Sequence, residues 1–135
     1  MQANQHCLNQ NYPSSVRLQH PSEFKRSLTG KRISRGALFV IHVPKTQNTH
    51  QKTARLGIIV GKRFARKAVT RNTIKRIIRE QFRLSQHQLP AVDIVIRLHR
   101  SVPELSLTQL KRKVSKELFW HFKKIADHFA KSSSC

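Results

Sequence analysis

Acidic residues are scarce in this sequence. Its 135 residues include 6 Asp and Glu against 27 Lys and Arg, which gives a formal net charge of +21. No acid occurs between Glu23 and Glu80, although Lys and Arg are frequent there. A compact domain with this much like charge repels itself, and an anionic partner relieves the repulsion. The composition therefore favours a protein that binds nucleic acid or an anionic membrane surface.

Long apolar runs are missing and cysteines are few. No stretch approaches the roughly 20 apolar residues that a membrane-spanning helix needs. Residues 1–10 have neither the charged segment nor the apolar segment of a secretory signal. The two cysteines, Cys7 and Cys135, stand near opposite ends of the chain. We expect free thiols, a cytoplasmic protein and no membrane partner.

The length suits one domain with one hydrophobic core. Periodicity and breaker residues predict a helix over 22–28, strands over 36–44 and 54–63, a helix over 68–84, a strand over 92–98 and a helix over 106–128. Ser22 and Ser106 are candidate N-caps, and the first two strands are expected to form an antiparallel hairpin. The pattern predicts a single α+β domain over 17–128, with helices packed on one small sheet. Disordered tails are expected at 1–16 and 129–135.

The predicted helix over 68–84 divides into an apolar face and a basic face at about 100° per residue. The apolar face carries Ile74, Ile77, Ile78 and Phe82. The opposite face and the loop before it carry cations around one amide: Lys62, Arg63, Arg66, Lys67, Arg71, Asn72, Lys75, Arg76 and Arg79. Solvated faces usually mix charges of both signs, because acid–base pairs one turn apart stabilise a helix. We therefore interpret this set, the basic surface, as a binding surface that grips phosphates through arginine forks.

The segment "GKRFARKAVTRNTIKRIIREQFR", residues 61–83, closely resembles the motif helix of bacterial ribonuclease P protein subunits. The resemblance extends over about 17–126 through "SEFKRSLTGKRISRGALFVIHV", "RLGIIVGKR" and "LPAVDIVIRLHRSVPELS". It implies a ribosomal protein S5 domain 2-like α+β fold, a mixed sheet with a left-handed βαβ crossover. It also implies an accessory role in which the protein assists a catalytic RNA that removes the 5′ leader of precursor tRNA. The implied partners are the ribonuclease P RNA and the leader, with no DNA, and the implied cofactor is Mg²⁺ bound mainly by the RNA.

By the same resemblance, the basic surface contacts the RNA subunit and a separate cleft holds the leader. The cleft is lined by strand positions and by an aromatic of the first helix, which is Phe24 here. Alternation along the strand places one set of side chains in the core: Phe39, Ile41 and Val43. We assign Phe24, Val40 and His42 to an open leader-binding cleft, since single-stranded RNA binds apolar and aromatic side chains in a positive field. The alternative for Phe24 is that it only anchors its helix to the core.

The chain itself shows no recognisable catalytic constellation. Its carboxylates are scattered, and its histidines include no pair at metal-binding helical spacing. We interpret His99 as a structural or RNA-contacting group rather than an acid or base. We expect no catalytic residue, no protein-held metal or other cofactor, and no activity without the RNA subunit.

Two other functions fit parts of the sequence. A ribosomal or other structural RNA-binding protein shares the size, the charge and the lack of catalytic groups, and only the long helix motif argues against it. A DNA-binding regulator would place the basic helix in a major groove, but no helix-turn-helix or dimer seam is visible. Cleavage reconstituted with a ribonuclease P RNA tests the first alternative, and competition between RNA and duplex DNA tests the second.

Overall fold

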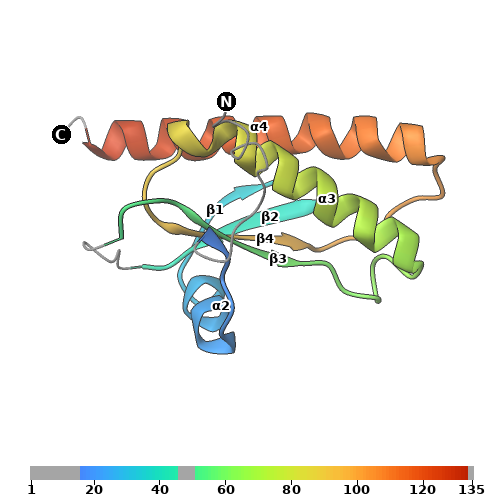
Figure 1. Ribbon diagram of the computed structural model, residues 1–135, viewed down its shortest axis with the longest axis horizontal. Coiled ribbons are helices and arrows are strands. Elements are labelled where there is room, and N and C mark those ends of the chain that lie inside the picture. The colour runs from blue at the N-terminus through green and yellow to red at the C-terminus, as the bar shows by residue number, and fades with distance from the viewer. Residues whose placement is uncertain (1–15, 46–50, 134–135) are drawn as a thin grey trace, which may run out of the picture.

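The computed structural model describes residues 16–45 and 51–133 (Figure 1). Its elements are α2 (Pro21–Leu28), β1 (Lys31–Arg35), β2 (Phe39–Val43), β3 (Arg55–Ile59), α3 (Ala68–Ser85), the short 3-10 helix η2 (Gln86–Gln88), β4 (Asp93–Leu98) and α4 (Leu107–Ser133). Most of the predicted N-terminal tail lies outside the described residues, and so does the end of the predicted C-terminal tail. Cys7 and Cys135 lie in these undescribed parts. Every predicted helix and strand is present, and β1 is an additional strand that the sequence analysis missed.

The four strands form one mixed sheet in the order β1-β2-β4-β3. β1 pairs with β2 and β2 with β4 in antiparallel orientation, while β3 runs parallel to β4. α3 joins the parallel pair and so completes a β3–α3–β4 crossover. The predicted α+β class with a mixed sheet is confirmed, and the left-handedness of the crossover stays a prediction.

The predicted hairpin between the strands over 36–44 and 54–63 is wrong. β2 pairs with β1, and β4 lies between β2 and β3. The almost continuous buried run of β4 explains this order, because a strand covered on both faces belongs in the middle of a sheet. β1 was missed because its sequence, KRISR, is polar, and its register with β2 shifts between Arg32 and Ser34.

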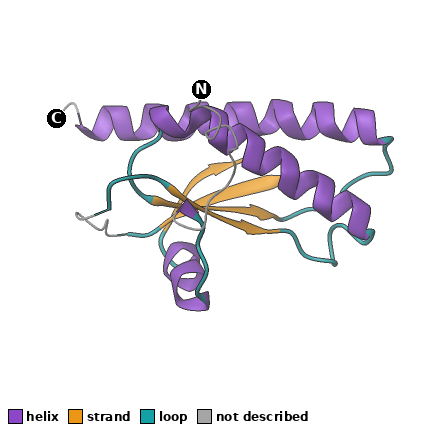
Figure 2. Ribbon diagram, in the orientation of Figure 1, coloured by secondary structure: helices purple, strands orange, loops and turns teal. Residues whose placement is uncertain are grey.

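Helices cover both faces of the sheet. α3 and α4 pack against each other on one face, and α2 lies on the opposite face (Figure 2). The hydrophobic core fills the space between the sheet and the α3–α4 layer. Its fully buried side chains include Phe39, Ile41, Ile74, Ile78, Phe82, Ile94, Ile96, Leu98, Leu118 and Ile125. This burial confirms the core sets predicted for β2 and α3, although Ile77 is only partly buried.

The start of α2 differs from the predicted one. The helix begins at Pro21 with His20 as its N-cap, so Ser22 is not the cap. Proline suits this first position because its fixed φ matches the helix and its missing N–H has no partner to lose there. The Glu23 carboxylate accepts the backbone N–H groups of Gln19 and His20 at 3.0 and 3.2 Å, which satisfies donors just ahead of the helix.

The limits of α4 agree with the sequence at one end only. The Ser106 hydroxyl accepts the N–H of Gln109 at 3.2 Å, which confirms the predicted cap. The helix extends to Ser133, past the predicted end at His128, and Phe129 packs against the core there. None of the helices in residues 16–45 and 51–133 combines the length and apolar composition that crossing a membrane requires.

A buried hydrogen-bond network fastens the β1–β2 hairpin to α4. The Glu117 carboxylate accepts the backbone N–H groups of Leu38 and Phe39 at 3.0 and 2.8 Å, and it lies 3.0 Å from Nε2 of His121. Nδ1 of His121 lies 2.6 Å from the Ser34 hydroxyl. Burial alone raises the pKa of Glu117, but the hydrogen bonds from His121 and the hairpin outweigh it, so the pKa is lowered. This contact with a distant helix explains how the polar strand β1 is held in the sheet.

Candidate nucleic-acid interface

The outward face of α3 carries exposed cations around an exposed amide. Asn72, Arg76 and Arg79 are exposed, whereas Ile74 and Ile78 are fully buried on the inner side. The separation arises because isoleucines at helical spacing pack on the sheet and leave the other side in water. This central part of the basic surface has the exposure that binding requires.

Arg71 is placed differently from its neighbours, because its guanidinium faces the loop before α3. Its Nη1 donates to the carbonyl oxygens of Ala65 and Arg66, each at 2.9 Å. These bonds hold the loop against the start of the helix, a positioning role that the sequence did not reveal. The guanidinium has five donors in all, so this role is compatible with a phosphate contact.

The loop between β3 and α3 extends the surface. Lys62, Arg63, Arg66 and Lys67 are all exposed. Three of them, Arg63, Arg66 and Lys67, border a hollow of about 500 Å³ that residues 101–105 close on the other side. The first turn of α3 has no acidic residue, and its N-cap, Lys67, makes no side-chain capping bond. The N–H groups of this helix end therefore add to the positive potential of the loop.

The single acid of α3 is neutralised locally. Glu80 and Arg83 form an exposed pair with Nη2 and Oε2 2.6 Å apart. The hydrogen bond from Arg83 lowers the pKa of Glu80, although partial burial opposes it. Such a surface pair adds little stability. Its consequence is that the one acid of α3 is paired with Arg83, on the C-terminal side of the exposed Asn72 and Arg76.

A groove of about 700 Å³ lies between α2 and the edge strand β3. Ile59 lines it from β3, and Phe24 and Leu28 line it from α2. Two cations, Lys25 of α2 and Lys75 of α3, approach it from different helices. Lys75 is therefore separated from the outward face of α3, to which the sequence assigned it, and stands where that helix meets the groove.

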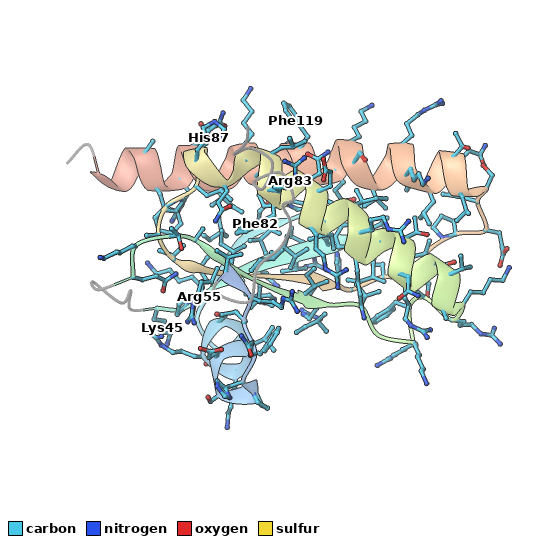
Figure 3. All side chains as sticks on the ribbon, viewed as in Figure 1. Lys45, Arg55, Phe82, Arg83, His87 and Phe119 are labelled. Atoms are coloured by element: carbon cyan, nitrogen blue, oxygen red, sulfur yellow. The ribbon has the colours of Figure 1, made fainter. Side chains whose placement is uncertain are left out.

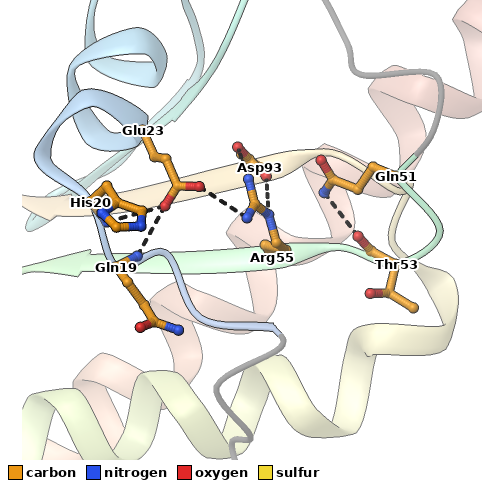
Figure 4. A network of polar contacts seen from close by, with 7 residues as sticks. All are labelled: Gln19, His20, Glu23, Gln51, Thr53, Arg55 and Asp93. Atoms are coloured by element: carbon orange, nitrogen blue, oxygen red, sulfur yellow. Dashed lines mark hydrogen bonds and ion pairs between the residues drawn. The ribbon is translucent and has the colours of Figure 1, made fainter.

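Two contacts fix α2 beside the groove. The Phe24 ring lies against Gly57 of β3, where an added Cβ would come within 2.6 Å of Phe24 Cε1. Arg55 of β3 links Glu23 of α2 to Asp93 of β4, with N···O distances of 3.0 and 2.8 Å (Figure 4). Both oxygens of the buried Asp93 accept from Arg55. Phe24 thus anchors its helix and lines the groove at the same time.

The strand register puts Val40 and His42 on the α2 face of the sheet but away from the groove. His42 and Gly57 both pair with Val95 of β4, so His42 shares the face on which Phe24 packs. β4 stands between these β2 residues and the groove. Val40 and His42 are only 1% and 7% exposed, so the open surface predicted at these positions is wrong.

Arginines occupy the sheet face around these two residues. Arg97 of β4 lies in one cross-strand row between Val40 and the groove residue Ile59. Its Nε donates to Nε2 of His42 at 3.4 Å. Burial lowers the pKa of His42, and the charges of Arg97 and Arg32 lower it further, so the ring is neutral at pH 7. Arg97 was not among the residues assigned to a site from the sequence, although the period-two alternation along β4 places it on the same face as Asp93 and Val95.

Among the described residues, the side chains that hold metals or catalyse hydrolysis are scattered or engaged in structural contacts. In residues 16–45 and 51–133, no group of three or more His, Cys, Asp or Glu could hold a metal ion. Ser34, His121 and Glu117 do align, but His121 is fully buried and the group is occupied in fastening the hairpin. Nε2 of His99 lies 3.0 Å from the carbonyl oxygen of Gly36 at the hairpin turn, which agrees with a structural role.

The sequence is similar to those of ribonuclease P proteins. The family model described as Ribonuclease P matches residues 12–124. The ribonuclease P protein component of Bordetella parapertussis is 47% identical over 116 residues, covering 84% of this chain and 94% of that protein. The ribonuclease P protein component of Azoarcus sp. is 41% identical over 96 residues, covering 71% and 78%.

Solved structures of RNase P proteins have the same fold. A Staphylococcus aureus RNase P protein, a mutant with defective mRNA degradation activity, aligns with a TM-score of 0.67 and 26% identity, covering 94% of this chain and 98% of that one. The RNase P protein of Thermotoga maritima aligns with a TM-score of 0.56 and 28% identity, covering 76% and 94%. The matched regions include both the basic surface and α2 with its groove.

Proposed function

This chain belongs to the ribonuclease P protein family and serves in the 5′ processing of tRNA. From that premise we propose that the basic surface docks the RNA subunit, while the groove beside α2 holds the 5′ leader of precursor tRNA. The observation that carries the proposal is the run of cations from Lys62 to Arg79, which contains no carboxylate. Arginine forks there match phosphate oxygens, and Asn72 offers a donor and an acceptor for a base edge or a 2′-hydroxyl.

The two surfaces can be occupied together. α3 and α2 lie on opposite faces of the sheet, so an RNA on the outward face of α3 does not cover the groove (Figure 1). The groove offers the apolar wall and flanking cations that single-stranded RNA binds, with Phe24 as the aromatic platform and Lys25 and Lys75 beside it. The half-buried Arg97 supplies positive charge on the adjoining sheet face.

In this arrangement the RNA subunit carries the catalysis, and the Mg²⁺ of the holoenzyme is held mainly by RNA. The protein contributes positioning and charge, because its cations reduce the repulsion between two polyanions that must associate. It should therefore lower the Mg²⁺ concentration at which the RNA subunit cleaves precursor tRNA. Metal-dependent cleavage by RNA-free protein that persists through repurification would contradict this division of roles.

Docking through α3 is tested by binding and cleavage with the RNA subunit. Arg76→Ala should flatten the log–log salt dependence of RNA-subunit binding by about 0.7–0.9, as loss of one phosphate contact does. Asn72→Ala should weaken binding without changing that slope. Lys45→Ala is the charge-matched control, since exposed Lys45 follows β2 and lies away from α3 (Figure 3). An equal effect of Arg76→Ala and Lys45→Ala would show that only net charge matters.

The leader assignment is tested by comparing two ligands on one variant. Phe24→Leu keeps an apolar anchor over Gly57 but removes the ring. It should weaken binding of precursor tRNA by the holoenzyme by about 1–3 kcal/mol if a base stacks on the ring. Mature tRNA, which lacks the leader, should bind unchanged. Equal losses for both tRNAs would return Phe24 to a purely anchoring role.

A further inference from the structure

α4 turns toward solvent an aromatic pair that the core does not use. Phe119 and Trp120 are 66% and 43% exposed, while Leu118 and His121 beside them are fully buried. Figure 3 shows Phe119 on the side of α4 that points away from the sheet. Isolated exposed aromatics are common on protein surfaces, but adjacent ones form a patch, and patches mark binding sites.

The aromatic pair lies within a strip of cations. Lys116 stands three residues before Phe119 and four before Trp120, and Lys123 stands four residues after Phe119 and three after Trp120. Residues at this spacing are neighbours on one side of a helix. Both lysines are exposed, and Nζ of Lys124 lies 5.1 Å from the centroid of the Trp120 ring. The α-helical rise separates Lys116 from Lys123 by about 10 Å along the axis. We call Lys116, Phe119, Trp120, Lys123 and Lys124 the α4 strip.

Two acids of α4, Glu117 and Asp127, stand near the α4 strip. Glu117 belongs to the same turn, but its carboxylate points inward and accepts the N–H groups of Leu38 and Phe39. Asp127 is exposed and lies one turn beyond Lys123, at the C-terminal end of the strip. A second copy of this chain does not fit the strip, because two such rows of lysine repel each other. Flat aromatic rings between three lysines, which outnumber this one exposed acid, fit RNA, whose unpaired bases stack and whose phosphates carry negative charge.

We propose that an unpaired base of the ribonuclease P RNA subunit stacks on Phe119 or Trp120, while Lys116 and Lys123 contact the phosphates on either side of it. The proposal rests on the proposed function, in which the RNA subunit docks on α3. α3 and α4 pack against each other on one face of the sheet, whereas the groove lies at the β3 edge, between that strand and α2 on the other face (Figure 1). RNA that covers α3 is therefore placed to reach α4, whereas a leader held in the groove is not.

Trp120 is the single tryptophan of the chain, so its fluorescence reports on the α4 strip alone. Titration of the full-length protein with the RNA subunit should quench this emission, because a stacked base contacts the indole ring. A short single-stranded leader oligonucleotide and vesicles containing phosphatidylserine should leave it unchanged at the same concentrations. Quenching by either of these ligands but not by the RNA subunit would overturn the proposal.

Substitutions test the energetic contribution of the α4 strip. Phe119→Ala should weaken RNA-subunit binding about thirtyfold, the middle of the range for one stacked base. Replacing Lys116 and Lys123 with alanine should flatten the salt dependence by about 0.7–0.9 for each lysine. The control is Leu107→Ala, which removes another exposed apolar side chain from α4, 46% exposed, and should bind as the wild type does.

The outcomes separate this proposal from the one on which it rests. Wild-type affinity of Phe119→Ala, together with unchanged Trp120 emission at saturating RNA subunit, overturns the α4 contact and leaves α3 docking intact. Arg76→Ala in the same titration tests α3 docking, and wild-type binding by that variant refutes it whatever Trp120 reports. Circular dichroism of each variant shows whether α4 is still formed, and the lysine variants repeat the test without touching an aromatic.

Discussion

Glu117 provides the sharpest test of how this highly charged chain stays folded. Its carboxylate accepts two backbone N–H groups of the β1–β2 hairpin and lies 3.0 Å from Nε2 of His121. An alanine there would leave three buried donors without an acceptor, each costing about 1–3 kcal/mol. We expect Glu117→Ala to lower the free energy of unfolding by about 3 kcal/mol or more. Glu117→Gln keeps the size and one acceptor oxygen, and we expect a loss of about 1–2 kcal/mol, the difference between charged and neutral acceptors.

The pH dependence of this difference tests its electrostatic origin. The pKa of Glu117 is lowered from its ordinary value of 4.5, so its stabilising contribution is fully present above that value. The contribution is lost as the pH falls through the lowered pKa, because the protonated group no longer accepts charge-assisted bonds. Denaturant unfolding of the wild type and of Glu117→Gln, from about pH 7 down to about pH 3, should show the two stabilities converging. Glu23 and Glu80, whose pKa values are also lowered, are present in both proteins and cancel in the comparison.

Glu104→Gln is the matched control, since Glu104 is an exposed glutamate just ahead of the same helix. Its stability should stay within about 0.5 kcal/mol of the wild type. Amide hydrogen exchange adds a local measurement, because the Leu38 and Phe39 N–H groups should exchange faster in both Glu117 variants than in the wild type. A stability difference that stays constant with pH, or unchanged exchange at these two amides, would refute the reasoning.

Three further substitutions test the positions of α2 and α3. Gly57→Ala places a Cβ 2.6 Å from Phe24 Cε1 and should shift α2, weakening binding of precursor tRNA but not of the RNA subunit in paired titrations. Ile78→Ala opens a cavity under α3 and should lower the free energy of unfolding by about 2–5 kcal/mol in denaturant titration. Arg55→Leu leaves the buried Asp93 carboxylate unpaired and should cost about 3 kcal/mol, which Asp93→Asn in the same chain should partly restore.

Local periodicity was sufficient to predict α3 and its two faces. Ile74 and Ile78 are fully buried and Arg76 is exposed, as the helical spacing of the isoleucines required. The same spacing placed Lys75 less well, because a residue about 100° from the buried side stands at the border of the two faces. The surroundings of Lys75 depend on α2 and β3, which form the groove with it and are distant from it in sequence.

Strand pairing was beyond what local patterns show. β3 finds its parallel partner β4 only through the α3 crossover, and β1 is held by Ser34, whose hydroxyl lies 2.6 Å from His121 of α4. The sequences of β3 and β1 contain no local pattern that predicts either contact. The buried run of β4 was a usable clue to its central position, since a strand that is apolar on both faces belongs inside a sheet, but it does not identify the two neighbours. Val40 and His42 were misplaced for the same reason, because a central β4 separates them from the groove.

The distribution of acids connects the stability of this fold with its function. Of the 6 acids, Glu23 and Asp93 bind Arg55, Glu80 binds Arg83, and Glu117 binds the hairpin. The other two are exposed: Glu104 lies ahead of α4, and Asp127 lies one turn beyond Lys123 of the α4 strip. The acids thus fix α2 and the hairpin in place, and none falls between Lys62 and Arg79. In a chain with randomly placed acids, the acids would pair with more of the arginines. The positive potential at α3 and α4 would then be weaker at the same net charge.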